Sequence, residues 1–156
     1  MPDLIHSWRF FALAAAVFAA LTAIFGKLGV STIPSNLATL IRTVVVLLIA
    51  AAIVGVRREW ERTEGMVVPA REVLFLVLSG AATGLSWLCY YRALQLGPAS
   101  GVAPLDKLSV VLVILFAWLF LGEPLSWRTI AGGALIAAGA ILISLSPSTP
   151  PVAPAP

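Results

Sequence analysis

Five long apolar runs dominate the chain, and short polar or proline-containing connections separate most of them. The runs cover residues 10–30, 35–56, 73–94, 99–121 and 127–146. A helix that spans a membrane needs about 20 mostly apolar residues at a rise of about 1.5 Å per residue. The pattern therefore predicts an all-α membrane protein with five transmembrane helices.

The connections and the two ends of the chain set the expected domain boundaries. Residues 57–72, RREWERTEGMVVPARE, interleave charges of both signs and indicate a solvated loop. Residues 122–126, GEPLS, predict a tight turn, because Pro124 blocks continuation of the helix before it. Half of residues 147–156 are proline, which predicts a disordered tail. We expect an N-terminal segment over 1–9, one five-helix domain over 10–146 and this tail.

The composition agrees with a membrane protein and excludes other classes. Hydrophobic residues make up 60% of the chain and charged residues 11%, whereas soluble domains carry roughly 25% charged residues. The lipid bilayer is therefore an expected partner. The net charge of +3 is small, and no basic patch interleaved with aromatic residues indicates nucleic-acid binding.

Catalytic and metal-binding chemistry finds no support in the sequence. His6 is the single histidine and Cys89 the single cysteine. We interpret His6 as an interfacial residue and Cys89 as a small core residue. The sequence contains no catalytic triad pattern, glycine-rich phosphate loop or metal-binding cluster. It therefore predicts no enzyme activity, no cofactor and no metal.

The distribution of arginine predicts the orientation in the membrane, because short cytoplasmic connections are enriched in Lys and Arg. Side A of the bundle would hold the N-terminus and the connections 57–72 and 122–126. Its arginines are Arg9, Arg57, Arg58, Arg62, Arg71 and Arg128. The opposite side, side B, has Lys27 and Arg92 near span ends. We expect a protein of the cytoplasmic (inner) membrane with its N-terminus in the cytoplasm and its C-terminus outside.

Three charged residues lie inside the apolar runs. Arg42 and Asp106 each follow the start of their run by seven residues, and Lys107 is next to Asp106. Both depths correspond to about 10 Å below side B. Such charges usually face one another or a cavity, and two interpretations stay open. Either Asp106 pairs with Arg42 across the second and fourth spans, or the surplus positive charge lines a substrate path. We expect the side chains of Lys27 and Arg92 to reach toward side B.

Pro104 lies two residues before Asp106 and is a candidate hinge. Inside a helix, proline leaves the carbonyl of the residue four positions earlier without its usual donor. Alternatively, Pro104 opens the helix, and residues 97–103 are irregular. Both versions weaken the backbone beside the charged pair, and interrupted helices recur near the binding sites of transporters.

The third apolar run carries a face of polar and aromatic residues. Thr83, Trp87 and Tyr91 follow an i, i+4, i+8 pattern, and Ser86 borders them. Aromatic side chains with a polar tip are suited to line a cavity and to stack on an organic substrate; the alternative is core packing. Gly80 and Gly84 form a G-x-x-x-G pattern, which predicts close helix packing.

These residues resemble the EamA-type repeat of the drug/metabolite transporter superfamily. The resemblance rests on YRALQLGPAS at 91–100, the proline-containing run after it, LGE at 121–123 and the glycine-rich last run. GKLG at 26–29 and NLATLIR at 36–42 fit the first half of the repeat. The resemblance implies a transporter that moves a small organic metabolite or drug. In that role we expect Asp106 to organise the site electrostatically and not to carry a proton, because neighbouring cations favour its charged form.

The chain differs in length from the familiar members, which have ten spans built from two repeats of inverted topology. It resembles the single-repeat, five-span subgroup, which implies a dimer of halves that works by alternating access. A homodimer, either antiparallel or parallel, would restore the two-repeat architecture. The alternative is a subunit of a heterodimeric lipid carrier, or a membrane assembly factor, that does not act alone.

Overall fold

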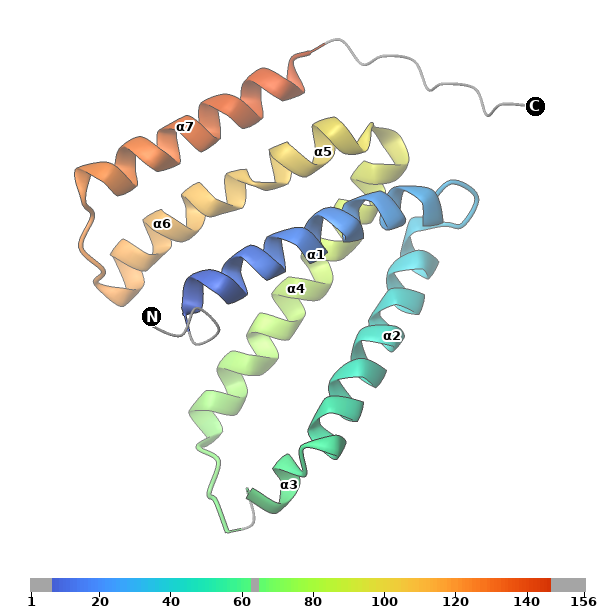
Figure 1. Cartoon of the computed structure of the whole chain (residues 1–156), viewed down its shortest axis with the longest axis vertical. Helices are drawn as coiled ribbons and strands as arrows, with labels where there is room; N and C mark the ends of the chain where they lie inside the picture. The colour runs from blue at the N-terminus through green and yellow to red at the C-terminus, as the bar shows by residue number, and fades with distance from the viewer. Residues whose placement is uncertain (1–6, 63–64, 147–156) are drawn as a thin grey trace. The chain divides into compact units, whose positions relative to one another are not determined.

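The computed structural model describes residues 7–62 and 65–146, whose regular structure is entirely helical (Figure 1). The expected tail 147–156 and His6 lie outside the described residues. In chain order the helices are α1 (Trp8–Gly29), α2 (Ser35–Val56), α3 (Glu59–Arg62), α4 (Ala70–Leu96), α5 (Ala99–Asp106), α6 (Leu108–Leu121) and α7 (Trp127–Ser144).

Five segments of the described chain are long and apolar enough to cross a membrane, as the sequence predicts. They are α1, α2, α4, the combined segment Ala99–Leu121 and α7. The second helix has the predicted bounds, because Pro34 precedes it with an extended backbone and accepts the N–H of Ala38. The third spanning helix is longer than predicted: it begins at Ala70 and ends at Leu96.

The connection predicted as a loop over 57–72 contains the one-turn helix α3. Two ion pairs accompany this helix: Arg57 with Glu59 at 3.6 Å and Arg58 with Glu61 at 3.4 Å. The side chains of both pairs are largely exposed, so each pair contributes little stability. The prediction of a loop over 57–72 is therefore wrong only at Glu59–Arg62, and the connection is polar as predicted.

The turn between α6 and α7 depends on Gly122 and Ser126. Gly122 has a φ of 67°, a left-handed conformation that side chains disfavour, and Glu123 N–H reaches back to the carbonyl of Ala117 at 3.2 Å. The hydroxyl oxygen of Ser126 then accepts the N–H of Thr129 at 3.1 Å and caps α7. The predicted tight turn is present, and Gly122 ends α6 before Pro124 is reached.

The fourth span is interrupted by one residue, beside the charged pair where the sequence predicts a weak point in the backbone. Residues from Ala99 are helical and Pro104 lies inside α5, so the alternative in which Pro104 opens the helix is wrong. The interruption falls at Lys107, where the N–H bonds to the carbonyl of Pro104 at 3.0 Å, three residues back. Val110 N–H bonds in the same way to the Lys107 carbonyl. This tighter winding is typical of a 3₁₀ turn and often marks a hinge.

The chain divides into two compact units by its backbone contacts. One unit is formed by Ile24–Gln95, and the other contains the residues up to Ala23 and those from Leu96 onward. In the second of these, α7 runs back alongside α6 and α5 (Figure 1). A side chain at Gly133 of α7 would place its first carbon 3.2 Å from Ile114 of α6, so this glycine permits the close packing of the two helices.

In the unit Ile24–Gln95, the end of α1 packs against the end of α4. Gly26 is buried, and a carbon added to it would lie 3.3 Å from Leu94 and 3.4 Å from the Tyr91 ring. Lys27 is half-buried, and its ammonium donates to the carbonyl of Leu94 at 2.6 Å. The sequence predicts that the Lys27 side chain extends toward side B; its ammonium instead binds a carbonyl in the last turn of α4. A cation is also favoured at this position by the helix dipole.

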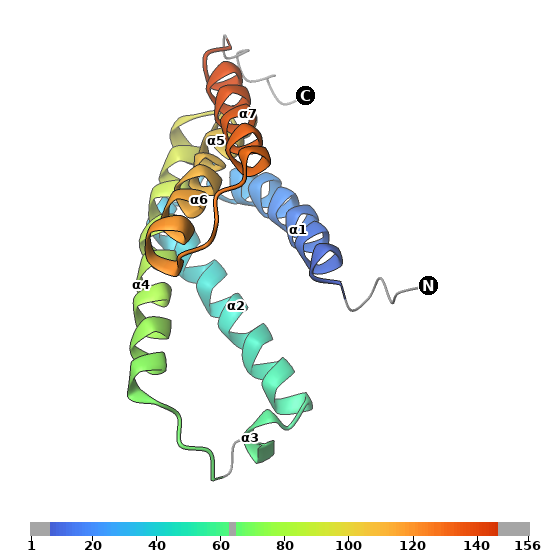
Figure 2. The same cartoon turned by 90° about the vertical axis from the view of Figure 1, so that its left-hand side faces the viewer.

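From this contact, α2 and α4 separate toward the connection that holds α3 (Figure 2). The side-chain amide of Gln95 donates to the carbonyl of Ile33 at 3.1 Å and ties the end of α4 to the residues before α2. The two helices are therefore held together at one end and lie apart at the other.

Gly26→Val is expected to destabilise the protein by about 1–3 kcal/mol, because the added methyl groups overpack the contact with Leu94 and Tyr91. Gly29→Val is the matched control: no atom lies within 4 Å of a carbon added there. The measurement is the free energy of unfolding of both variants in detergent. Equal effects of the two substitutions would contradict the packing described for α1 and α4.

Candidate functional site

A pocket opens between α2 and α4 inside the unit Ile24–Gln95. Its volume is about 390 Å³. We call it the Arg42 pocket; it is lined by Arg42, Thr43, Val46, Leu76, Ser79, Gly80, Thr83, Gly84 and Trp87. The lining combines one cation, one large aromatic ring and three hydroxyl-bearing side chains.

The guanidinium of Arg42 lies over the face of the aromatic ring of Trp87. Its central carbon is 3.3 Å from the centroid of the Trp87 ring and 5.9 Å from that of Tyr91. A guanidinium above the face of an indole is attracted by the ring quadrupole, and tryptophan is the strongest partner for this contact. The stacking uses the face of the guanidinium and leaves its N–H edges free to point elsewhere.

No carboxylate pairs with Arg42 among the described residues, and its N–H groups make no hydrogen bond to another residue of that part. Arg42 lies seven residues into α2 and is half-buried. A cation at this depth of a membrane protein usually faces a cavity or a partner charge. The stacked, half-buried Arg42 therefore presents unused donors to the pocket that it lines.

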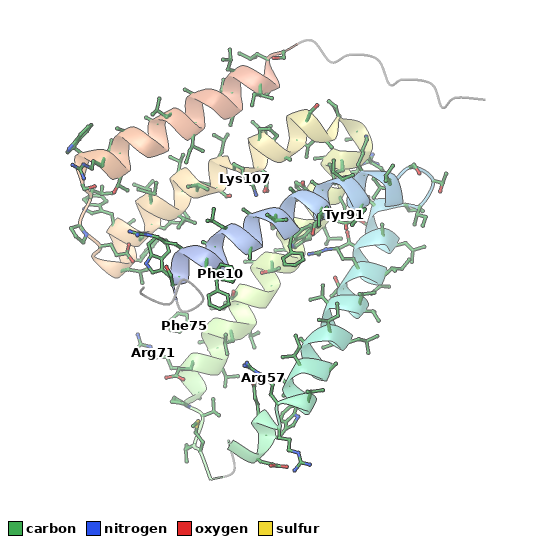
Figure 3. All side chains as sticks on the ribbon, viewed as in Figure 1. Phe10, Arg57, Arg71, Phe75, Tyr91 and Lys107 are labelled. Atoms are coloured by element: carbon green, nitrogen blue, oxygen red, sulfur yellow. The ribbon has the colours of Figure 1, made fainter. Side chains whose placement is uncertain are left out.

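Three aromatic residues of α4 form a cluster beside this pocket. The ring centroids of Trp87 and Tyr91 are 5.8 Å apart, and those of Trp87 and Tyr90 are 5.4 Å apart. Tyr91 is 5% exposed and lies on the side of α4 that faces α2 (Figure 3). Its ring contacts Gly26, so Tyr91 is a packed support for Trp87, and Trp87 itself lines the pocket.

The structure brings together some of the residues that the sequence singles out. Thr83 and Trp87 line the pocket with Arg42, and Tyr91 packs beside it. Ser86 is exposed and is not part of the lining. The shared face of Thr83, Trp87 and Tyr91 is therefore directed to the second helix, as their spacing indicates.

Gly80 and Gly84 do not make, inside the unit Ile24–Gln95, the close helix packing that their pattern predicts. A carbon added to either would meet no atom within 4 Å, and both line the Arg42 pocket. Within this unit, their missing side chains widen the pocket and bring no helix into close contact. Ser79 and Thr43 are lining residues that the sequence reasoning missed. The i, i+4 repeat of Ser79 and Thr83 on the face of Trp87 is a signal that indicates Ser79; Thr43 follows Arg42 directly in α2 and has no such signal.

Asp106 and Lys107 lie at the break between α5 and α6 (Figure 3). The Lys107 ammonium donates to the Asp106 carboxylate at 3.2 Å, and the side chains are 54% and 36% exposed, respectively. Asp106 and Arg42 belong to different compact units. The predicted pair between them stays a prediction.

These features define a multi-pass helical membrane protein with a cationic, aromatic pocket inside one unit. Residues 6–145 match the model of the EamA-like transporter family. The chain belongs to this family of transporters, which are not enzymes.

Two similar proteins differ in length: the chain covers nearly all of one and about a third of the other. An "uncharacterized transporter in cobO 3'region" of Sinorhizobium sp is 56% identical over 140 residues, which are 90% of this chain and 98% of the relative. A "probable terminal-alkyne amino-acid exporter" of Streptantibioticus cattleyicolor is 36% identical over 106 residues, 65% of this chain and 32% of the relative. If 106 residues are 32% of it, the second relative is about twice as long as this chain of 156 residues. No solved structure matches the chain.

The contact between Arg42 and Trp87 is expected to stabilise the fold measurably. A double-mutant cycle with Arg42→Gln and Trp87→Leu should give a coupling energy of about 1–2 kcal/mol, because the contact is partly desolvated. The measurement is the free energy of unfolding in mixed micelles.

Arg71 and Phe75 of α4 supply the control pair (Figure 3). Their separation is 5.6 Å and Phe75 is 57% exposed, so the same cycle with Arg71→Gln and Phe75→Leu should give a smaller coupling. Additive effects of the Arg42 and Trp87 substitutions would contradict a stabilising contact.

Proposed function

We propose that the chain moves a small organic metabolite that carries a carboxylate across the cytoplasmic membrane. The observation that carries this proposal is the guanidinium of Arg42, which is stacked on Trp87 and has no acidic partner in the described part of the chain. A guanidinium is planar and presents paired N–H groups that match the two oxygens of a carboxylate. In this proposal Arg42 binds the carboxylate, and Trp87 fixes the plane of the guanidinium.

The rest of the pocket supports a substrate with a polar end and a small apolar body. Thr83 and Ser79 supply hydroxyl groups, although the Thr83 hydroxyl donates to the Ser79 carbonyl at 2.8 Å. Val46 and Leu76 supply apolar surface. The relative named as a probable amino-acid exporter supports the same substrate class. We therefore place zwitterionic amino-acid-like compounds first among the candidates.

The lengths of the relatives support a dimer of five-helix halves. This chain matches one relative of its own length almost completely and a third of a relative about twice as long. Transporters built from two repeats place the substrate between them and alternate between two openings. In this proposal two copies of the chain supply the two halves, and Pro104 and the break at Lys107 supply the hinge.

Arg42→Gln is expected to reduce uptake of carboxylate-bearing substrates by about tenfold or more, since a hydrogen bond to a charged group contributes roughly 1.5–3 kcal/mol. Uptake of neutral analogues, such as amino-acid amides without the carboxylate, should change far less. The measurement is uptake into liposomes that contain the purified chain alone, with a panel of amino acids that includes one with a terminal alkyne. An equal loss for both substrate classes would assign Arg42 a structural role.

Two controls accompany the transport assay. Asp106→Asn should keep both the substrate preference and the pH profile of wild-type transport, because in this proposal Asp106 pairs with Lys107 at 3.2 Å and does not carry a proton. Loss of the pH dependence in a folded Asp106→Asn protein would make Asp106 a proton carrier. If the folded wild-type chain takes up no compound alone but does so with a second five-span chain, the protein is a subunit of a heterodimer.

The orientation proposed from the arginines places the 57–72 connection in the cytoplasm. Val67 of this connection is 88% exposed and is a suitable labelling position. A cysteine at Val67, introduced with Cys89→Ala, should resist a membrane-impermeant thiol reagent applied from outside intact cells and react after the cells are opened. Reaction of about half of the molecules from outside would indicate an antiparallel dimer, and complete reaction would reverse the orientation.

A further inference from the structure

A second pocket lies at the side B end of the unit Ile24–Gln95, apart from the Arg42 pocket. Its volume is about 740 Å³. We call it the Arg92 pocket; its polar lining comes from Thr32, Ser35, Asn36, Arg92 and Gln95. None of these residues lines the Arg42 pocket. The two pockets therefore offer separate sets of polar groups.

Gln95 holds the two walls of the Arg92 pocket together. Its amide nitrogen donates to the carbonyl of Ile33 at 3.1 Å, and its amide oxygen accepts from the guanidinium of Arg92 at 3.0 Å. One N–H of Arg92 is fixed by this bond, and the other guanidinium donors have no partner in the described part of the chain. The geometry orients Arg92 and leaves most of its donors unused.

Ser35 supplies an independent indication of a ligand. It is 7% exposed and lines the pocket, and its hydroxyl has no hydrogen-bond partner among the described residues. The hydroxyl oxygen is not sealed from the surface, since no enclosed side-chain polar atom of the described residues lacks a partner. The hydroxyl is therefore open to the pocket and free to donate to a ligand oxygen.

The charge of the lining selects an anion. The pocket has one arginine and no acidic residue. Ser35 and Asn36 also begin α2, a helix of 22 residues whose N-cap, Pro34, makes no side-chain capping bond. The first N–H groups of a helix lack intrahelical partners and favour negative charge. The hydroxyl of Ser35, the guanidinium of Arg92 and these N–H groups form one set of donors.

The depth of the pocket identifies the source of the anion. Arg92 lies four residues before the end of α4, about 6 Å along the helix axis, at the level expected for lipid headgroups. Leu88, one turn further into the membrane, adds an apolar wall below the donors. A polar end with an apolar continuation toward the membrane centre matches a phospholipid and not a soluble anion.

We propose that the Arg92 pocket binds the phosphate headgroup of an anionic phospholipid of the side B leaflet. The phosphate oxygens accept from Arg92 and Ser35, and the start of an acyl chain lies along Leu88. The bound lipid links the residues before α2 to the end of α4, and so stabilises the end at which these helices meet. This inference does not depend on the substrate proposed for the Arg42 pocket.

The test measures lipid binding by the purified full-length chain in a nonionic detergent, by native mass spectrometry and by the shift of the unfolding temperature. Phosphatidylglycerol should bind at least about tenfold more tightly than phosphatidylcholine, whose choline group cancels the net charge. Arg92→Gln should remove this preference. Arg71→Gln, a substitution at the opposite end of the same helix, should keep it.

Ser35→Ala distinguishes a loss of lipid binding from a loss of stability. The Ser35 hydroxyl makes no internal hydrogen bond that the substitution would break. This variant should unfold at the wild-type temperature without lipid and bind phosphatidylglycerol several-fold more weakly. Equal binding of the two lipids, or wild-type preference in both Arg92→Gln and Ser35→Ala, would overturn the proposal. A stabilisation by inorganic phosphate or glycerol 3-phosphate equal to that by the lipid would also overturn it, since the site would then take a soluble anion.

Discussion

The contact between the last turn of α1 and the last turns of α4 positions both pockets of the unit Ile24–Gln95. Gly26 brings the backbone of α1 close to the buried Tyr91 and Leu94, and Lys27 donates to the Leu94 carbonyl. Lipid supplies no hydrophobic drive between helices, so close packing and polar contacts must hold them. At the same end, Gln95 of α4 bonds to the carbonyl of Ile33, just before α2. From this end α2 and α4 diverge (Figure 2), and the Arg42 pocket lies between them.

The membrane also constrains how this unit places its charges. A cation at membrane depth needs an anion, a carbonyl, an aromatic face or water. Lys27 uses a carbonyl and Arg42 uses an aromatic ring, so neither needs a carboxylate from the same unit. An ion pair would consume the N–H groups of the guanidinium, whereas stacking leaves them available. With Trp87 as its partner, Arg42 is stabilised by an aromatic face and keeps its N–H groups available for the anion proposed above.

The sequence was sufficient for the class of fold and for the shared face of Thr83, Trp87 and Tyr91 on α4, but not for the helix that this face meets. Apolar runs predict spanning helices because length and hydropathy act locally, and the bounds Ser35–Val56 are correct for this reason. Pro104 predicts a weakened backbone beside the charged pair, but not that the interruption falls at Lys107, because the apolar pattern continues through this residue and the tighter winding is a matter of backbone geometry. The same limit applies to Gly80 and Gly84: a missing side chain permits a close neighbour or an open pocket, and the surrounding helices decide which.

The Arg92 pocket shows most clearly what sequence reasoning misses. Ser35 and Arg92 are far apart in the chain, and each has an ordinary role by itself: the first residue of a helix, and a cation near a span end. Their common chemistry exists because Gln95 binds the carbonyl of Ile33 and thereby joins the two segments. Arg42 and Arg92 are thus each oriented by a neighbour that leaves donors unused, one by an aromatic face and the other by an amide oxygen. Lysine could not replace either arginine in this arrangement, because a compact ammonium has neither the face that stacks on Trp87 nor the fork that bonds Gln95 and still presents paired donors.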